Sequence, residues 1–118
     1  MAVAQINVQS VTGQTIASLT LNYSIGDANA EALLVCVASK DTGGGGADNP
    51  VTGVTFNSVA LTQIYQFAQS SRVNSMWWLL KSNFPANITA KDIVVTFTGT
   101  IQDAVFGAVE LTAAAALE

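Results

Sequence analysis

The residues that could do chemistry in this chain are carboxylates and one thiol, because the sequence contains no histidine. Serine–histidine triads, cysteine–histidine pairs and histidine metal sites are therefore excluded. The single cysteine, Cys36, lies in the apolar run ALLVCVAS, so we interpret it as a small buried hydrophobe rather than a nucleophile. Without a second cysteine, no intrachain disulfide can form.

Most carboxylates fall at predicted turns, where solvated or capping roles are favoured over paired-carboxylate catalysis. Glu110 differs, because it lies in the last predicted strand, and we place it on the outer face of that strand. We therefore expect a protein that is not an enzyme and that needs no cofactor. The other carboxylates considered are Asp27, Glu31, Asp41, Asp48, Asp92 and Asp103.

The glycine-rich segment 41–50, DTGGGGADNP, contains three hard oxygen donors that could serve calcium, namely Asp41, Asp48 and Asn49. Their spacing does not match an EF-hand, and four consecutive glycines are costly to order. The lysine and hydroxyl that follow the glycines of a phosphate-binding loop are missing. We interpret the segment as a mobile surface loop and keep a weak calcium site as the alternative.

Aromatic residues are the candidates for binding a ligand. Trp77 is the first of them, because an exposed aromatic on a strand can stack on a sugar ring or on a partner surface. The alternative is burial under a loop or a second sheet. Tyr65 and Phe67, on the preceding predicted hairpin, have the same two alternatives.

The strand that must position these aromatics is 73–81, VNSMWWLLK, which contains both tryptophans. Alternation along a strand directs its large side chains to two opposite sides. The first side holds Met76, Trp78 and Leu80, and the second holds Trp77, Leu79 and Lys81. The first side carries no charge among its large residues, so we assign it to the core.

About eight strands are predicted, spaced about a dozen residues apart, and no segment is typical of a long helix. Segment 32–40 is almost wholly apolar, so we expect both of its faces to be covered. The residues around Asn57 and Ser58 predict a hairpin between two short strands. The predicted strands are 4–11, 15–23, 32–40, 51–56, 59–67, 73–81, 91–99 and 104–111.

This pattern predicts an all-β fold: a two-sheet antiparallel sandwich, either immunoglobulin-like or jelly-roll, with a closed barrel as the structural alternative. The 118 residues fit a single domain, which we assign to 1–113. Residues 114–118, AAALE, resemble a cloning scar and are excluded from the fold.

The composition excludes several classes of protein. Half of the residues are hydrophobic and 10% are charged, which excludes a disordered chain. The net charge is −4 and the chain has only four basic residues, so it lacks the basic surface that binds a phosphate backbone, and we expect no nucleic-acid partner. No apolar run reaches the length of a membrane span, about 18 residues, and no signal peptide is visible at the start.

Four segments in order resemble a β-sandwich module that recurs in bacterial surface proteins and in phage structural or tail proteins. They are LLVCVAS, VTGVTFNSVALTQI, MWWLLKSNFPA, and the pair DIVVTFTG with AVFGAVELT, which together span residues 33–112. The resemblance implies the fold but no catalytic residues. Such modules serve as spacers, adhesins and glycan binders, so the resemblance leaves the function open.

Two functions follow as expectations. The first is a non-catalytic structural, adhesive or assembly module of a larger protein that is extracellular, on the cell surface or part of a virion. The alternative is a carbohydrate-binding module that uses exposed aromatics. The expected partner is a glycan or a protein, and self-association is included.

Overall fold

The computed structural model describes residues 3–41, 50–69 and 71–113. Within this part the chain is all-β, with every strand pairing antiparallel, and one short 3-10 turn, η1, follows the sixth strand. The elements are β1 (Val3–Tyr23), β2 (Ala30–Lys40), β3 (Val51–Phe56), β4 (Val59–Ala60), β5 (Thr62–Gln69), β6 (Arg72–Leu80), η1 (Lys81–Asn83) and β7 (Lys91–Ala113).

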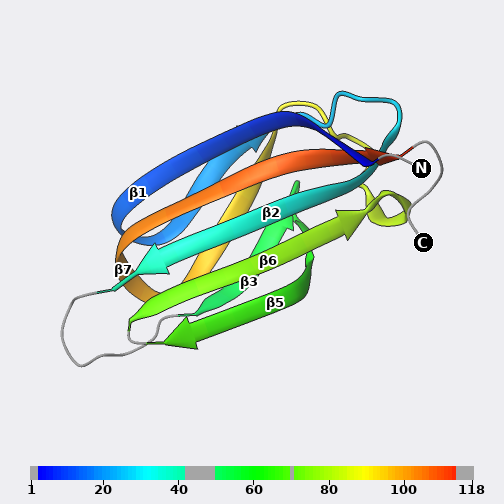
Figure 1. The fold of residues 1–118 in the computed structure, drawn as a ribbon. Helices are drawn as coiled ribbons and strands as arrows, with labels where there is room; N and C mark the ends of the chain where they lie inside the picture. Colours follow the sequence, from blue (N-terminus) through cyan, green and yellow to red (C-terminus); the bar gives the residue numbers. More distant parts are fainter. Residues whose placement is uncertain (1–2, 42–49, 70, 114–118) are drawn as a thin grey trace.

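The seven strands form one hydrogen-bonded sheet in the order β4-β3-β7-β2-β6-β5, with β1 also paired to β7. β1 and β7 are long and bent, and Figure 1 shows them running from one half of the sheet into the other. β7 pairs with β3 through its first part and with β2 through its last part. The sheet is therefore nearly closed and barrel-like.

The predicted breaks at residues 12–13 and 100–103 are not breaks. Gly13 pairs with Ala104 and Gln14 pairs with Asp103, so the ladder between β1 and β7 passes through both segments. The first segment pairs with the residues that follow the second, and the second pairs with the residues that follow the first, so each finds backbone partners on the neighbouring strand. Four predicted strands are thereby merged into two, and seven strands form where about eight were expected.

β1 bends where its pairing with β7 changes register, between Ile6 and Gln9 and again between Ile16 and Ser18. A positive φ accompanies each bend, 53° at Asn7 and 51° at Thr15. Extra residues in one strand of an antiparallel pair increase its local bend and twist. These two irregularities allow one strand to serve both halves of the sheet.

The hairpin predicted at Asn57 and Ser58 is confirmed. Both residues have positive φ, 46° and 66°, as a tight two-residue hairpin turn requires. The returning strand is shorter than predicted, because β4 ends at Ala60. Leu61 is buried and its N–H donates to the Val54 carbonyl at 2.8 Å. From Thr62 the chain pairs with β6, so the prediction that 59–67 pairs with β3 is wrong beyond Ala60.

The face assigned to the tryptophan strand is also wrong. In β6 the buried side chains alternate with exposed or half-buried ones, and Met76 and Trp78 belong to the second group. Lys81, whose charge decided the assignment, lies in η1 beyond the end of the strand, so it carries no information about the two faces of β6. The buried side chains of β6 are Val73, Ser75, Trp77 and Leu79.

The core lies between the two halves of the sheet, and its members come from both. Tyr23, Phe56 and Phe106 are its largest fully buried side chains. Burying an apolar side chain of this size contributes about 1.5–3 kcal/mol, so the packing of the two halves stabilises the closed sheet.

Glu110 belongs to this interior, although we placed it on the outer face. Its side chain is 1% exposed, because it shares a face of β7 with Phe106 and Ala108. The Asp27 N–H donates to Glu110 Oε1 at 3.0 Å. The Tyr23 hydroxyl lies 3.5 Å from Oε2 and donates to the Asn7 carbonyl at 2.8 Å.

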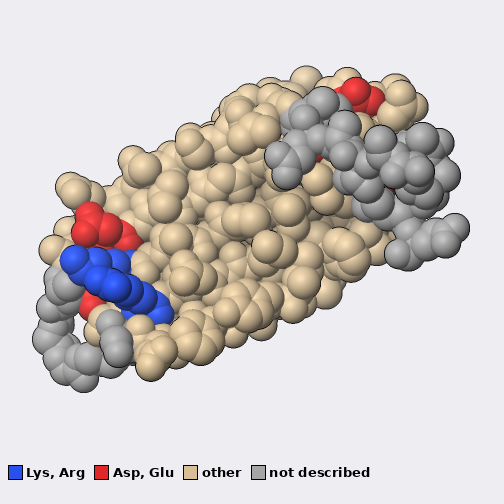
Figure 2. Space-filling view, in the orientation of Figure 1, with Lys and Arg blue, Asp and Glu red and all other residues tan. Residues whose placement is uncertain are grey.

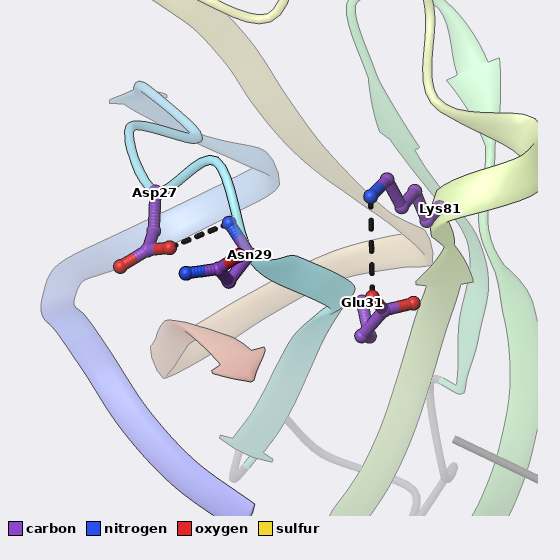
Figure 3. A network of polar contacts seen from close by, with 4 residues as sticks. All are labelled: Asp27, Asn29, Glu31 and Lys81. Carbon is purple, nitrogen blue, oxygen red and sulfur yellow. Dashed lines mark hydrogen bonds and ion pairs between the residues drawn. The ribbon is translucent and has the colours of Figure 1, made fainter. Parts of the chain in front are cut away.

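The same carboxylate is tied to the turn that leads into β2. Asp27 Oδ1 accepts the N–H of Asn29 at 2.6 Å, as Figure 3 shows. This local side-chain bond is a common way of closing a turn. Glu110 thus holds the turn, through Asp27, against the inside of the sheet.

We expect replacement of Glu110 by alanine to destabilise the fold by about 2 kcal/mol, because the Asp27 N–H would lose its buried acceptor. Glu110→Gln keeps an acceptor oxygen and should cost less than about 1 kcal/mol. Urea unfolding followed by tryptophan fluorescence measures both. Equal losses in the two variants would contradict the role of the acceptor oxygen.

We also expect stability to fall in alkali because of Tyr23. Burial, and then the charge of Glu110, raise the pKa of this hydroxyl well above its usual range. Above about pH 10 the unfolded state therefore loses its proton first, and the free energy of unfolding decreases as the pH rises. Urea unfolding at about pH 9 and about pH 11 should show a larger decrease in the wild type than in Tyr23→Phe.

Candidate functional site

The candidate site is the outward side of β1, β7, β2, β6 and β5, which we call the outer face. Side chains that are paired across neighbouring strands point to the same side of a sheet, so the register defines its rows. The first row is Gly107, Cys36, Met76 and Tyr65; the second is Val105, Ala38, Asn74 and Phe67; the third is Gln14, Asp103, Lys40, Arg72 and Gln69.

The outer face exposes large apolar side chains. Tyr65 is 52% exposed and Phe67 is 49% exposed, and both lie on the edge strand β5. Met76 and Val105, in the same two rows, are also exposed. An exposed cluster of this kind, larger than a single scattered side chain, is typical of an interaction surface.

β2 contributes to this exposure in a way that contradicts the sequence prediction. We expected both faces of its apolar run to be covered, but among the described residues one face is buried throughout and the other is covered only toward the start of the strand. Leu33, Val35 and Val37 are buried, whereas Cys36, which we expected in the core, is exposed. The apolar character of the other face around Cys36 is therefore not explained by packing within the described part of the chain.

Trp77 does not belong to the outer face. It is 6% exposed, and its indole Nε1–H donates to Ser75 Oγ at 2.9 Å inside the core. Of the two alternatives that the sequence left open, burial is the one that the structure shows. This side chain is therefore enclosed and not presented to a ligand.

Tyr65 and Phe67, in contrast to Trp77, are exposed on the outer face. Tyr65 lines a hollow on this face together with Met76 and Cys36. Tyr65 is therefore the predicted binding residue that the structure leaves accessible, and its binding role remains a prediction.

The calcium candidates are only partly described. Asp41 is half-buried, and its N–H donates to the Ser71 carbonyl at 2.8 Å. Asp48 and Asn49 lie outside the described residues. Among the residues that are described, no group of three or more acidic or cysteine side chains is placed to hold a metal ion.

The outer face contains two open hollows. The larger, of about 680 Å³, is lined by residues of β1, β2, β6 and β7 and includes Lys40, Arg72 and Asp103. The smaller, of about 290 Å³, reaches Tyr65 on β5. Both hollows are lined by residues of β2, β6 and β7, and three residues belong to both: Ala38, Asn74 and Val105. The two hollows therefore form one continuous groove.

The basic side chains visible on the outer face lie at one end. Figure 2 shows Lys and Arg side chains gathered there beside acidic ones, with no charge across the middle of this face. Lys40 ends β2 and Arg72 begins β6, and the two residues are directly opposite in the antiparallel register. The larger hollow opens between them and Asp103.

From the sequence we gave no site role to Lys40, Arg72 or Asn74, and we placed Asp103 at a turn. The pairing of β2 with β6 brings the first two together, although three strands lie between them in the sequence. The weak signal in the sequence is that each basic residue bounds an apolar strand. That signal becomes informative only when the register between the two strands is known.

Comparisons with protein-family models, with curated proteins and with solved structures find no match for this chain. Among the described residues, no helix has the length and hydrophobicity needed to cross a membrane.

We expect Cys36 to be a chemical probe of this face. It is exposed, and partial desolvation raises the pKa of its thiol, so it holds less thiolate at neutral pH than an ordinary cysteine. The folded protein should react fully with a disulfide reagent, more slowly than the urea-unfolded chain, and faster as the pH rises. Reaction only after unfolding would contradict the exposure of Cys36.

Proposed function

We propose that this chain is a non-catalytic structural, adhesive or assembly module of a larger extracellular, cell-surface or virion-associated protein. The observation that carries the proposal is the edge strand β5, which lies beside the uncovered apolar side of β2 and β6. The kind of host protein is supported by the four sequence segments that resemble surface and phage modules.

β5 lacks the usual protection of a sheet edge. Its eight residues, TQIYQFAQ, include no charged residue and no proline, and all of them except Gln66 are exposed. Its backbone ladder runs to β6, and no other backbone bond to β5 is found among the described residues. An edge of this length without charge is a template for another strand.

One irregularity limits the part that can pair. The register of β5 with β6 shifts between Gln63 and Tyr65, so Tyr65–Gln69 is the regular part of the edge. The Gln66 side chain points inward, accepting the Val51 N–H at 2.9 Å and donating to the Val51 carbonyl at 3.3 Å. This pair of bonds ties β5 to the first residue of β3.

The fold behind the proposal is the two-sheet sandwich expected from the sequence, immunoglobulin-like or jelly-roll. Support comes from the core, whose members are drawn from β2 and β6 on one side and from β3 and the start of β7 on the other. Further support comes from the chain around Leu61. Before this residue β4 pairs with β3, and after it β5 pairs with β6.

The second candidate function is a carbohydrate-binding module. It is favoured by one observation, the exposed ring of Tyr65 at a hollow that also contains the amide of Asn74. Aromatic faces and amide groups are suited to the apolar and polar sides of a sugar.

The assembly role is tested by sedimentation velocity from about 10 μM to about 1 mM, where a small interface associates. We expect the mass of the wild type to rise with concentration and that of Phe67→Lys to stay monomeric, because an edge lysine opposes strand addition. Val8→Lys is the matched control, since Val8 is 68% exposed and lies on β1. A wild type that stays monomeric throughout would contradict assembly between copies through β5.

A further inference from the structure

The end of the outer face contains two cations that form no ion pair with any residue in the described part of the chain. Lys40 and Arg72 are both exposed and directly opposite each other on β2 and β6. Like charges in directly opposed positions destabilise a strand pair. Their juxtaposition therefore favours a third, negatively charged group between or above them.

One described carboxylate, on β7, lies directly opposite Lys40, but it forms no ion pair with either cation. That carboxylate is Asp103, which lines the same hollow and whose Oδ1 accepts a hydrogen bond from Gln14 Nε2 at 3.0 Å. The ion pair found among the described residues joins Lys81 to Glu31 at 3.9 Å, and Figure 3 shows it beside η1, which follows the far end of β6. No ion pair to a described carboxylate is formed by either cation.

The two cations lie on the wall of the larger hollow. Its volume of about 680 Å³ lies within the range of small-molecule sites, roughly 300–1,000 Å³. Ala38, Ala104 and Val105 give this hollow apolar lining, and Asn74 adds a donor and an acceptor. A ligand there would meet charge at one end and apolar surface beyond it.

The groove continues from the cations toward an aromatic ring. Asn74, Ala38 and Val105 join the larger hollow to the smaller one, where Tyr65 lies. The groove crosses several strands and is open along its length, so it suits a chain of linked units better than a single compact molecule.

We propose that this groove binds an acidic oligosaccharide, with a carboxylate or sulfate at Lys40 and Arg72 and a following sugar ring on Tyr65. The guanidinium of Arg72 can grip either anion with two parallel hydrogen bonds, and Lys40 adds a second positive charge. The apolar face of a sugar packs on the tyrosine ring, and its hydroxyls bond to Asn74. This site rests on the second candidate function, carbohydrate binding, and does not require the assembly role of β5.

An acidic peptide would supply the anion but not the ring faces that Tyr65 and the apolar floor accommodate. A long polyanion is opposed by the net charge of −4. The ligand that uses every part of the groove is therefore a short, charged sugar chain.

The test is a titration of the isotope-labelled protein followed by amide NMR shifts. The probes are an oligogalacturonate, a sulfated carrageenan oligosaccharide, a neutral malto-oligosaccharide and an oligoglutamate peptide. We expect one of the acidic sugars to bind with shifts clustered at residues 36–40, 72–76 and 103–107, and the neutral sugar to bind at least about tenfold more weakly.

Three variants assign the binding to this groove. Lys40→Gln and Arg72→Gln should each weaken binding of the acidic sugar about tenfold or more, because each removes a charge-assisted bond. Tyr65→Ala should weaken it as well, through lost stacking. Lys91→Gln is the matched control: it removes the same charge from a lysine that lines a different hollow, and it should bind like the wild type.

Four results would overturn the proposal. They are no binding by either acidic sugar, equal weakening in Lys91→Gln, shifts that cluster away from the groove, and oligoglutamate binding as tightly as the acidic sugar. Self-association measured on Phe67→Lys is a separate readout, so the failure of this site and the failure of the assembly role are distinguishable. Slower thiol–disulfide exchange between Cys36 and a disulfide reagent in the presence of the sugar would be an independent sign that the groove is occupied.

Discussion

The backbone ladder between β1 and β7 is the constraint on which the rest of the structure depends. It runs nearly the full length of both strands and bends at two changes of register, so one pair of strands belongs to both halves of the sheet. β2 pairs with the last part of β7 and β3 with its first part, which places their apolar faces on opposite sides of one core. Without the bends, the same strands would form a flat sheet with no interior.

This closure determines which side chains can meet a ligand. Once Val35, Trp77 and Phe106 are directed inward, alternation forces Cys36, Met76 and Gly107 outward in a single row. The same alternation brings Lys40 and Arg72 together at the end of the face. The groove, the exposed Tyr65 and the cation pair are therefore consequences of how the core is packed.

The strands and turns were largely predictable, because they depend on local pattern. Periodicity located the apolar segments, and Asn57 with Ser58 identified the hairpin turn. The faces were less predictable where both sides of a strand are apolar. In β6 the decision depended on Lys81, which lies outside the strand, and the burial of Ser75 depends on its hydrogen bond with Trp77. The same limit applies to Glu110, whose buried partners are far away in the sequence.

By itself the sequence determined the all-β class, the absence of histidine chemistry and the identity of the apolar strands, because these follow from composition and short-range periodicity. Tertiary structure alone decided that the segments around Gly13 and Ile101 continue as strands, that Trp77 is enclosed, and that Lys40 faces Arg72. The physical reason is that strand pairing joins residues distant in the chain. A backbone group forms a turn or a ladder according to the partner it meets, and no local pattern specifies that partner.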